Sequence, residues 1–221
     1  TMINPSDSGV VLVDYNAQTQ IVAQNTNGPA DYELFVNGIS FHTASNTTFY
    51  QSSFISNITE NTYCSLVVSQ GDSNVIRNFT IFVNNTENQA IPSDLDHGIN
   101  YNNDLSKVTL VIEAPFKDFI YVAGSFNNYQ PDSEYAMKKD TNSDLFWIDI
   151  EGLSPGQIET YQYWVYDQSP ASGSPKEVRT ADPYSTLVLS PFDDPWIPEN
   201  SYPNLPDYPT GQSREVTVLQ T

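Results

Sequence analysis

Basic residues are scarce in this sequence, which has eight Lys and Arg against 27 Asp and Glu and a formal net charge of −19. A surface with this charge repels phosphate groups, so we expect neither nucleic acid nor an anionic membrane as a partner. Long apolar runs are also missing, and none approaches the roughly 20 residues that a membrane-spanning helix requires. We therefore expect no membrane insertion.

Cysteine and the usual catalytic motifs are nearly absent. The single cysteine, Cys64, cannot form an internal disulfide, and it alternates in phase with Leu66 and Val68, which indicates a buried apolar position. The only histidines are His42 and His97, and no G-x-S-x-G, P-loop or H-E-x-x-H motif occurs. We predict that this chain is not itself an enzyme and has no catalytic residues.

One segment resembles a calcium-binding loop. Asp140, Asn142, Asp144 and Glu151 occupy positions 1, 3, 5 and 12 of such a loop, but Leu145 stands at position 6, where glycine is required. The residues after Asp144 also read as a strand. We predict a hairpin turn here, with no metal and no cofactor.

Aromatic residues and prolines are plentiful, with 14 Tyr, 11 Phe and 15 Pro. Together with short alternating apolar runs they indicate an all-β chain with many turns. In the first half Asn37-Gly38 predicts a two-residue hairpin turn, since both residues accept positive φ angles. We predict an immunoglobulin-like sandwich over residues 1–90, with strands near residues 9–15, 31–36, 39–43, 47–54, 62–69 and 74–84.

A second sandwich is predicted over residues 91–190, after a polar boundary segment at 85–106. Its strands are expected near residues 107–114, 118–124, 145–150, 161–167 and 179–190. Residues 191–221 contain six prolines, and we predict an extended connector toward a missing catalytic domain. Its last residues, 215–221, read as a strand that begins a further unit.

The strands at 145–150 and 161–167 suggest a pairing. If Ile150 lies opposite Tyr161 in an antiparallel pair, the apolar side chains share one face, and Trp147 meets Trp164 on the other face. The prediction is that two indole rings stand side by side, facing away from the core. Such rings suit the C–H face of a pyranose. An equal alternative is that the Pro-rich segment or a neighbouring domain covers the two rings.

Several motifs carry a family resemblance. GSFNNY (124–129), FWIDI (146–150), GLSPG (152–156), YQYWVYD (161–167) and ADPYS (181–185) resemble carbohydrate-binding module family 48, the immunoglobulin-like N-terminal domain of many glycoside hydrolase family 13 enzymes. The segment 182–211 further resembles α-amylase-type proteins of the Bacteroidetes kind, in which the catalytic barrel follows. The resemblance covers residues 97–221, whereas residues 1–90 resemble only a generic immunoglobulin-like domain that precedes such a module.

The resemblance also implies binding residues. Tyr129 stands where the family's turn tryptophan binds α-glucan, Gln162 where some members place a sugar-contacting lysine, and Trp147 matches a strand tryptophan. The sequence departs from the family's pattern at two of these positions, with Tyr in place of Trp and Gln in place of Lys. The predicted carbohydrate-binding residues are Tyr129, Trp147, Trp164 and Gln162, with Asn127 and Asn128 shaping the turn.

These features predict the non-catalytic α-glucan-binding or docking region of an amylase-type glycoside hydrolase. Its expected partners are an α-glucan polysaccharide (starch, glycogen or pullulan) and its own downstream catalytic domain. No signal peptide is visible, so we expect a mature or trimmed chain that is secreted or at the cell surface, extracellular or periplasmic. Two alternatives stay open: spacer domains that pack on the barrel without binding sugar, and a surface adhesion or protein-interaction array.

Overall fold

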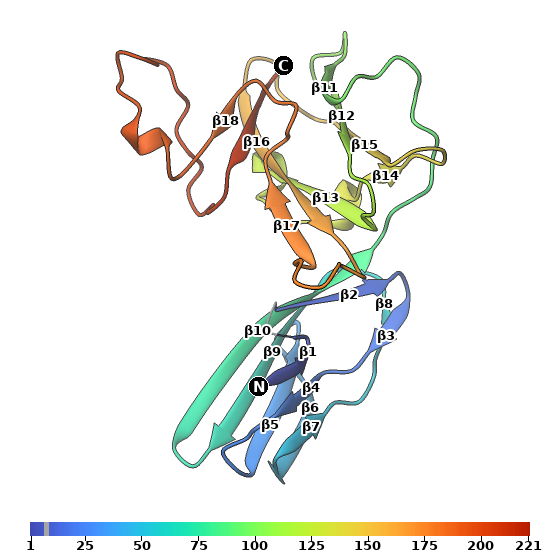
Figure 1. Ribbon diagram of the computed structural model, residues 1–221, viewed down its shortest axis with the longest axis vertical. Coiled ribbons are helices and arrows are strands. Elements are labelled where there is room, and N and C mark those ends of the chain that lie inside the picture. The colour runs from blue at the N-terminus through green and yellow to red at the C-terminus, as the bar shows by residue number, and fades with distance from the viewer. Residues whose placement is uncertain (7–8) are drawn as a thin grey trace. The chain divides into compact units, whose positions relative to one another are not determined.

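The computed structural model describes residues 1–6 and 9–221, and every regular element within them is a β-strand or a short 3-10 helix (Figure 1). The prediction of an all-β fold is confirmed. No helix in the described residues is long and apolar enough to cross a membrane. The chain divides into two compact units, the first formed by Thr1–Asn85 with Gln168–Lys176 and the second by Thr86–Asp167 with Glu177–Thr221.

The first unit contains β1 (Met2–Asn4), β2 (Val10–Asp14), β3 (Ala17–Thr19), β4 (Val22–Gln24), β5 (Ala30–Val36), β6 (Ile39–Thr47), β7 (Phe49–Gln51), β8 (Ile55–Ile58), β9 (Thr62–Gln70) and β10 (Ser73–Asn84). Its main sheet has the strand order β2-β10-β9-β5-β6, and smaller sheets have the orders β1-β4-β7 and β3-β8. The predicted two-residue turn joins β5 to β6, where Val36 pairs with Ile39, and Asn37 and Gly38 have φ angles of 50° and 78°.

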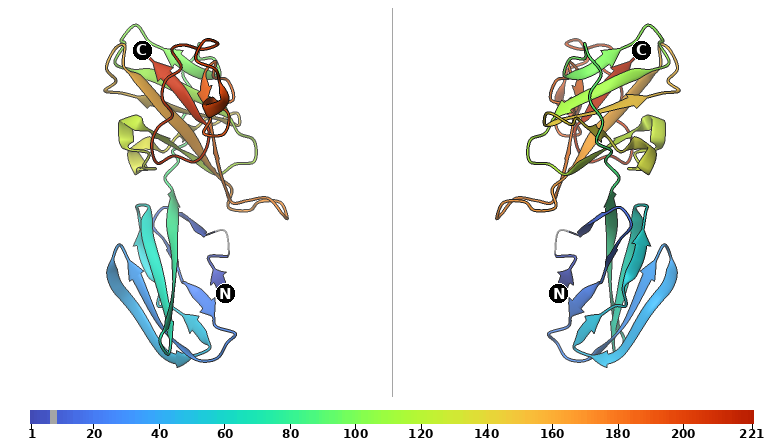
Figure 2. Two further views of the ribbon diagram at one scale, coloured as in Figure 1. Left: turned by 90° about the vertical axis from the view of Figure 1, so that its left-hand side faces the viewer. Right: turned by 90° about the vertical axis from the view of Figure 1, so that its right-hand side faces the viewer.

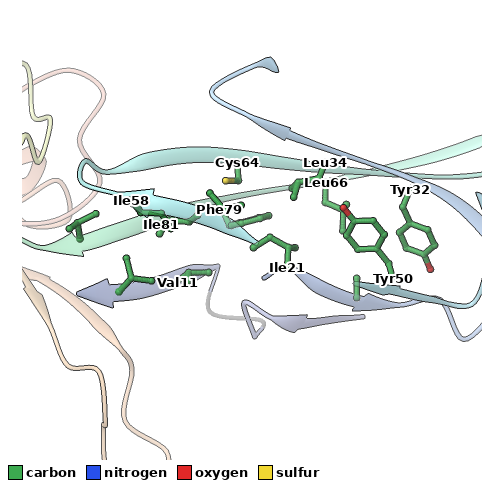
Figure 3. Packing of buried hydrophobic residues seen from close by; sticks show 14 of the residues in the cluster. Val11, Ile21, Tyr32, Leu34, Tyr50, Ile58, Cys64, Leu66, Phe79 and Ile81 are labelled. Carbon is green, nitrogen blue, oxygen red and sulfur yellow. The ribbon is translucent and has the colours of Figure 1, made fainter. Parts of the chain in front are cut away.

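Alternating side chains of these strands form the core of the first unit (Figure 3). Tyr32 and Tyr50 stack there with ring centroids 5.0 Å apart. Cys64 is fully buried in the same cluster, as its phase with Leu66 predicted. Burial raises the pKa of the Cys64 thiol to about 12.

The second unit contains β11 (Gly98–Tyr101), β12 (Val108–Glu113), β13 (Phe119–Gly124), η1 (Ser125–Asn127), η2 (Ser133–Tyr135), β14 (Lys138–Lys139), β15 (Leu145–Ile150), β16 (Ile158–Tyr166), β17 (Glu177–Thr180), β18 (Val188–Leu189), η3 (Asp194–Trp196) and β19 (Val216–Gln220). One sheet has the order β11-β12-β15-β14, and the other has the order β13-β16-β19-β18 with β17 also paired to β16. Figure 2 shows η1 and η2, in yellow-green, beside the strands of this unit.

The core of the second unit is formed by apolar side chains from both sheets. Leu110, Phe146 and Ile148 come from the first sheet and Tyr161 and Tyr163 from the second, all within one buried cluster. Fully burying a large side chain of this kind stabilises a fold by roughly 1.5–3 kcal/mol. The alternation read from the sequence therefore identified the buried face of both β15 and β16.

The predicted pairing of these two strands is wrong. β15 pairs with β12 and β14, whereas β16 pairs with β13, β17 and β19. The chain changes sheets between Ile150 and Ile158, so the two apolar faces meet across the core instead of lying side by side. Alternation fixes which face of a strand is buried, but it leaves the neighbouring strand open.

The expectation that residues 215–221 begin a further unit is also wrong. β19 lies inside the second sheet, where it pairs with β16 on one side and β18 on the other. Val216 and Leu219 are buried, and Leu219 belongs to the core cluster. The apolar residues of this strand therefore complete the second unit.

The calcium-like segment forms the predicted hairpin turn between β14 and β15. The backbone N–H of Asp140 donates to the carbonyl oxygen of Leu145 at 2.8 Å. The Asp140 carboxylate accepts hydrogen bonds from the hydroxyl of Ser143 and from the backbone N–H groups of Ile91 and Asn142. The Ser143 bond is the largest of the effects that lower the pKa of Asp140.

Candidate functional site

Trp147 projects from β15 on the side away from the core, and it is covered by the chain itself. Only 3% of its surface is exposed. Its Nε1 donates to the carbonyl oxygen of Gln89 at 3.1 Å, and Lys138 Nζ lies 4.5 Å from the ring centroid. The backbone of Gln89 is held in turn by Lys139, whose carbonyl oxygen accepts from the Gln89 N–H at 2.9 Å. The indole therefore offers no open face.

Trp164 and Gln162 share the outer face of β16 and are also covered. The guanidinium carbon of Arg179 lies 3.5 Å from the centroid of the Trp164 ring, which is 8% exposed. Gln162 is 1% exposed, and its Nε2 donates to the carbonyl oxygens of Arg214 and Glu215, both at 3.1 Å. Gln162 thus holds the backbone just before β19 in place. Its amide nitrogen is therefore already engaged in hydrogen bonds within the protein.

The predicted tryptophan platform therefore does not form. Trp147 and Trp164 belong to different sheets, and each ring is stacked under a cation of its own sheet. Of the six predicted residues, Asn127, Asn128 and Tyr129 lie together in the turn that follows β13. Trp164 and Gln162 are neighbours on β16, where the Trp164 Nε1 donates to Gln162 Oε1 at 3.3 Å.

That turn is tightly built. Asn127 is buried, and its side chain accepts from the N–H of Gly124 at 2.8 Å and donates to the carbonyl oxygen of Val122 at 3.0 Å. Gly124 is required by close packing, because a Cβ there would lie 2.6 Å from the Phe126 ring and 2.8 Å from the carbonyl oxygen of Thr160. Asn127 therefore shapes the turn from within.

Asn128 and Tyr129 present their side chains from unusual backbone conformations. Their φ angles are 53° and 55°, in the left-handed region. Asn tolerates this region, but for a bulky residue such as Tyr it costs about 1–2 kcal/mol. Asn128 is exposed and Tyr129 is partly exposed. Strain of this kind concentrates at functional sites, so Tyr129 is the residue of the turn that most needs an explanation.

The Tyr129 ring is anchored at its hydroxyl end. Its hydroxyl shares a hydrogen bond with Thr160 Oγ1, and its backbone N–H donates to the carbonyl oxygen of Gly124 at 2.8 Å. Burial raises the pKa of Tyr129, and the nearby Tyr208 and Glu159 raise it further, against the Thr160 bond. Sequence reasoning missed Tyr208 and Glu159, since both reach the turn only through the fold.

The YQYWVYD (161–167) and ADPYS (181–185) motifs meet in a buried structural cluster. Asp182 is 2% exposed, and its Oδ2 accepts from the hydroxyls of Tyr161 at 2.7 Å and Tyr163 at 3.1 Å. Its Oδ1 accepts from the N–H of Tyr184, and its own N–H donates to Thr217 Oγ1. Burial raises the pKa of both Tyr161 and Tyr163 well above the ordinary value, and the Asp182 carboxylate adds to this. These motifs tie β16, β19 and the segment between β17 and β18 together.

No family model and no curated protein matches this chain. Among solved structures it is similar to a pullulanase of group B Streptococcus in complex with maltotetraose, with 11% identity, a TM-score of 0.37 and 95% of this chain covered against 26% of the other. An apo pullulanase from Klebsiella pneumoniae matches with 15% identity, a TM-score of 0.35 and coverages of 83% and 23%. The catalytic module of the glycogen-degrading pneumococcal virulence factor SpuA matches with 20% identity, a TM-score of 0.33 and coverages of 44% and 14%.

This chain therefore spans between 14% and 26% of the length of these proteins. At these identities and TM-scores the similarity identifies no family.

Proposed function

We propose that this chain is a non-catalytic α-glucan-binding region of a secreted or surface amylase-type glycoside hydrolase, and that Tyr129 and Asn128 make the sugar contact. The observation that carries the proposal is the strained presentation of a partly exposed, hydroxyl-anchored Tyr129 ring. Gly or Asn would occupy that backbone conformation at lower energy. The same position carries the sugar-binding aromatic in the family that the sequence resembles.

The chemistry of the turn suits a neutral pyranose. An aromatic ring packs against the apolar C–H face of the sugar, and an exposed amide such as that of Asn128 both donates to and accepts from hydroxyl groups. The anchored Tyr129 ring loses little further freedom on binding, which favours affinity. With a net charge of −19 the chain disfavours anionic polysaccharides, so a neutral glucan is the fitting partner.

Affinity gel electrophoresis with starch, glycogen and pullulan tests the proposal. We expect retardation of the parent chain and a loss of about tenfold in affinity for Tyr129→Ala, because an aromatic contact of about 1.4 kcal/mol corresponds to that factor. Tyr63→Ala, at a tyrosine of the first unit that is 50% exposed, is the matched control and should bind as the parent does. If no glucan retards the parent, or if Tyr129→Ala migrates as the parent does, the binding proposal fails.

A structural spacer is the second candidate function. The observation that favours it is the covering of Trp147 and Trp164 by other parts of this chain, which leaves neither indole for a ligand. A spacer would show no retardation in any glucan gel, yet its removal would lower the thermal stability of the adjoining catalytic domain. Comparing the parent enzyme with and without this region separates the two candidates.

A further inference from the structure

A cavity of about 450 Å³ lies between the two larger sheets of the first unit. Met2 lines it from the sheet β1-β4-β7, and Val68, Val75 and Arg77 line it from the main sheet. Tyr32 lines it as well, and Figure 3 shows this residue at one end of the labelled core side chains. The volume is within the range of small-molecule sites, which is about 300–1,000 Å³.

Arg77 stands at a core-facing position of β10. In the register with β9 it lies opposite Leu66, and two residues later Phe79 lies opposite Cys64. These three neighbours all belong to the core of the unit. Alternation therefore calls for an apolar side chain at position 77, yet the residue there is an arginine and is exposed. A charged side chain on a core-facing position is costly unless it reaches water or a partner, and the cavity gives Arg77 that access.

The charge around the cavity differs from that of the rest of the unit. Arg77 is the only Lys or Arg among residues 1–85, which contain six acidic residues. None of the residues that line the cavity is acidic, and no described carboxylate forms an ion pair with Arg77. One N–H of its guanidinium donates to the carbonyl oxygen of Ile76 at 3.3 Å, which leaves most of its five donors available. The cavity is therefore a local site of positive charge in an acidic unit.

Hydrogen bonds hold the rim of the cavity in place. The N–H of Asn25 donates to the carbonyl oxygen of Thr48 at 2.9 Å, and its Nδ2 donates to Gln70 Oε1 at 3.4 Å. Gln70 Nε2 donates in turn to the carbonyl oxygen of Asn27 at 3.3 Å. Gln24 and Asn27 also line the cavity, and their side-chain amides take part in none of these bonds. A rim that is already ordered lowers the entropy that a ligand must overcome.

We propose that this cavity binds a small organic carboxylate, whose carboxylate group pairs with the Arg77 guanidinium and whose apolar body packs against Val68 and Val75. The planar guanidinium donates two parallel hydrogen bonds to a carboxylate, a pairing that lysine cannot make. A monoanion balances the single cation, whereas a phosphate dianion would add an uncompensated charge to an acidic unit. The site lies within the first unit, and it is independent of the sugar contact proposed at Tyr129.

NMR titration of the ¹⁵N-labelled parent chain with hexanoate, acetate and hexanamide tests this proposal. We expect hexanoate to shift the backbone amide signals of Asn25, Asn27 and Val75. It should bind at least tenfold more tightly than acetate, which lacks the apolar body, and at least tenfold more tightly than hexanamide, which lacks the charge. N-acetylvalylleucine and its C-terminal amide repeat the comparison, and the tighter of the two carboxylates distinguishes a free acid from a peptide C-terminus as the source of the group.

Arginine variants locate the charge that is responsible. Arg77→Gln should lower the affinity for hexanoate at least tenfold, and Arg77→Lys should give an intermediate loss because it keeps the charge without the planar fork. Arg214→Gln, at an exposed arginine of the second unit, makes the same change in net charge and should bind hexanoate as the parent does. Arg77→Gln should keep the melting temperature of the parent, since the exposed guanidinium pairs with no described carboxylate.

Comparison of ligands on the parent chain alone can overturn the proposal. If hexanoate binds no more tightly than acetate, Arg77 takes anions only as any exposed cation does; if it binds no more tightly than hexanamide, the guanidinium has no part in binding. Unaltered hexanoate affinity in Arg77→Gln, or an equal loss in Arg214→Gln, also refutes the site. Tyr129→Ala should bind hexanoate as the parent does, so the outcome of the glucan gels and the outcome of this titration are separate.

Discussion

Replacing Asp182 with alanine should destabilise the second unit strongly. The carboxylate is 2% exposed and is the acceptor for the hydroxyls of Tyr161 and Tyr163 and for the N–H of Tyr184. Each buried donor left without an acceptor costs roughly 1–3 kcal/mol, so the two hydroxyls alone predict a loss of about 2–6 kcal/mol in the free energy of unfolding. That is a large fraction of the stability of an ordinary domain, about 5–15 kcal/mol.

Urea titration followed by tryptophan fluorescence measures this loss, since Trp147, Trp164 and Trp196 all lie in the second unit. With a denaturant slope of about 1–3 kcal/mol per molar urea, the midpoint of Asp182→Ala should fall by at least about 0.7 M. The companion variants Tyr161→Phe and Tyr163→Phe should each cost about 1 kcal/mol in the parent chain, the net value of one hydrogen bond.

The same tyrosine variants should behave oppositely in the Asp182→Ala background. There the hydroxyls have already lost their acceptor, so removing them relieves the burial of unsatisfied donors and should restore part of the stability. If Asp182→Ala costs less than about 1 kcal/mol, or if the tyrosine variants cost the same in both backgrounds, the carboxylate is not the acceptor that holds this cluster together.

Three further outcomes are expected. Stability should fall above about pH 10, because burial raises the pKa of Tyr161, Tyr163 and Tyr166 well above the unfolded value, so the stability that these groups contribute is fully present below that pH and is lost as the pH rises. In urea titrations the slope should grow from near zero at about pH 8 toward about 4 kcal/mol per pH unit at about pH 11, and a flat profile would contradict this prediction. Cys64, fully buried with its pKa raised to about 12, should not react with a thiol reagent at neutral pH until the chain is unfolded, and rapid reaction of the native protein would show that the first core opens. Phe116 is 90% exposed and has a φ of 62°, a conformation that glycine adopts without strain, so Phe116→Gly should stabilise the second unit by about 1 kcal/mol in the same urea assay. Phe116→Ala, which keeps the strained backbone, is the control, and a loss of stability in Phe116→Gly would show that the phenylalanine ring packs in solution.

The sequence allowed the buried faces to be predicted because they depend on local alternation. Phe146 and Ile148 in β15, and Tyr161 and Tyr163 in β16, all lie in the core cluster as their spacing required. The choice of neighbouring strands depends on where a connection crosses between sheets, and the segment between β15 and β16 has no residue that distinguishes a hairpin from a crossing. The predicted pairing of β15 with β16 was therefore wrong, although the predicted buried face of each strand was correct.

The candidate site was predictable to the same extent. The turn around Tyr129 carries its own signals in Gly124 and two asparagines, and its backbone bonds are local. By contrast, the side chain of Gln162 is engaged by backbone carbonyls of Arg214 and Glu215, about fifty positions later in the chain. Hydrogen-bond partners so distant in sequence cannot be predicted from the residues that flank Gln162.

The position of β19 has a consequence for biosynthesis. The beginning of β16, Ile158–Tyr161, pairs with β19, so this part of its edge stays uncovered until the ribosome has added β19. At about 5–20 residues per second this interval lasts several seconds, during which the unpaired part of the edge is open to intermolecular association. The first unit can begin to fold before β19 of the second unit has been synthesised, and dependence on chaperones should be greatest in that interval.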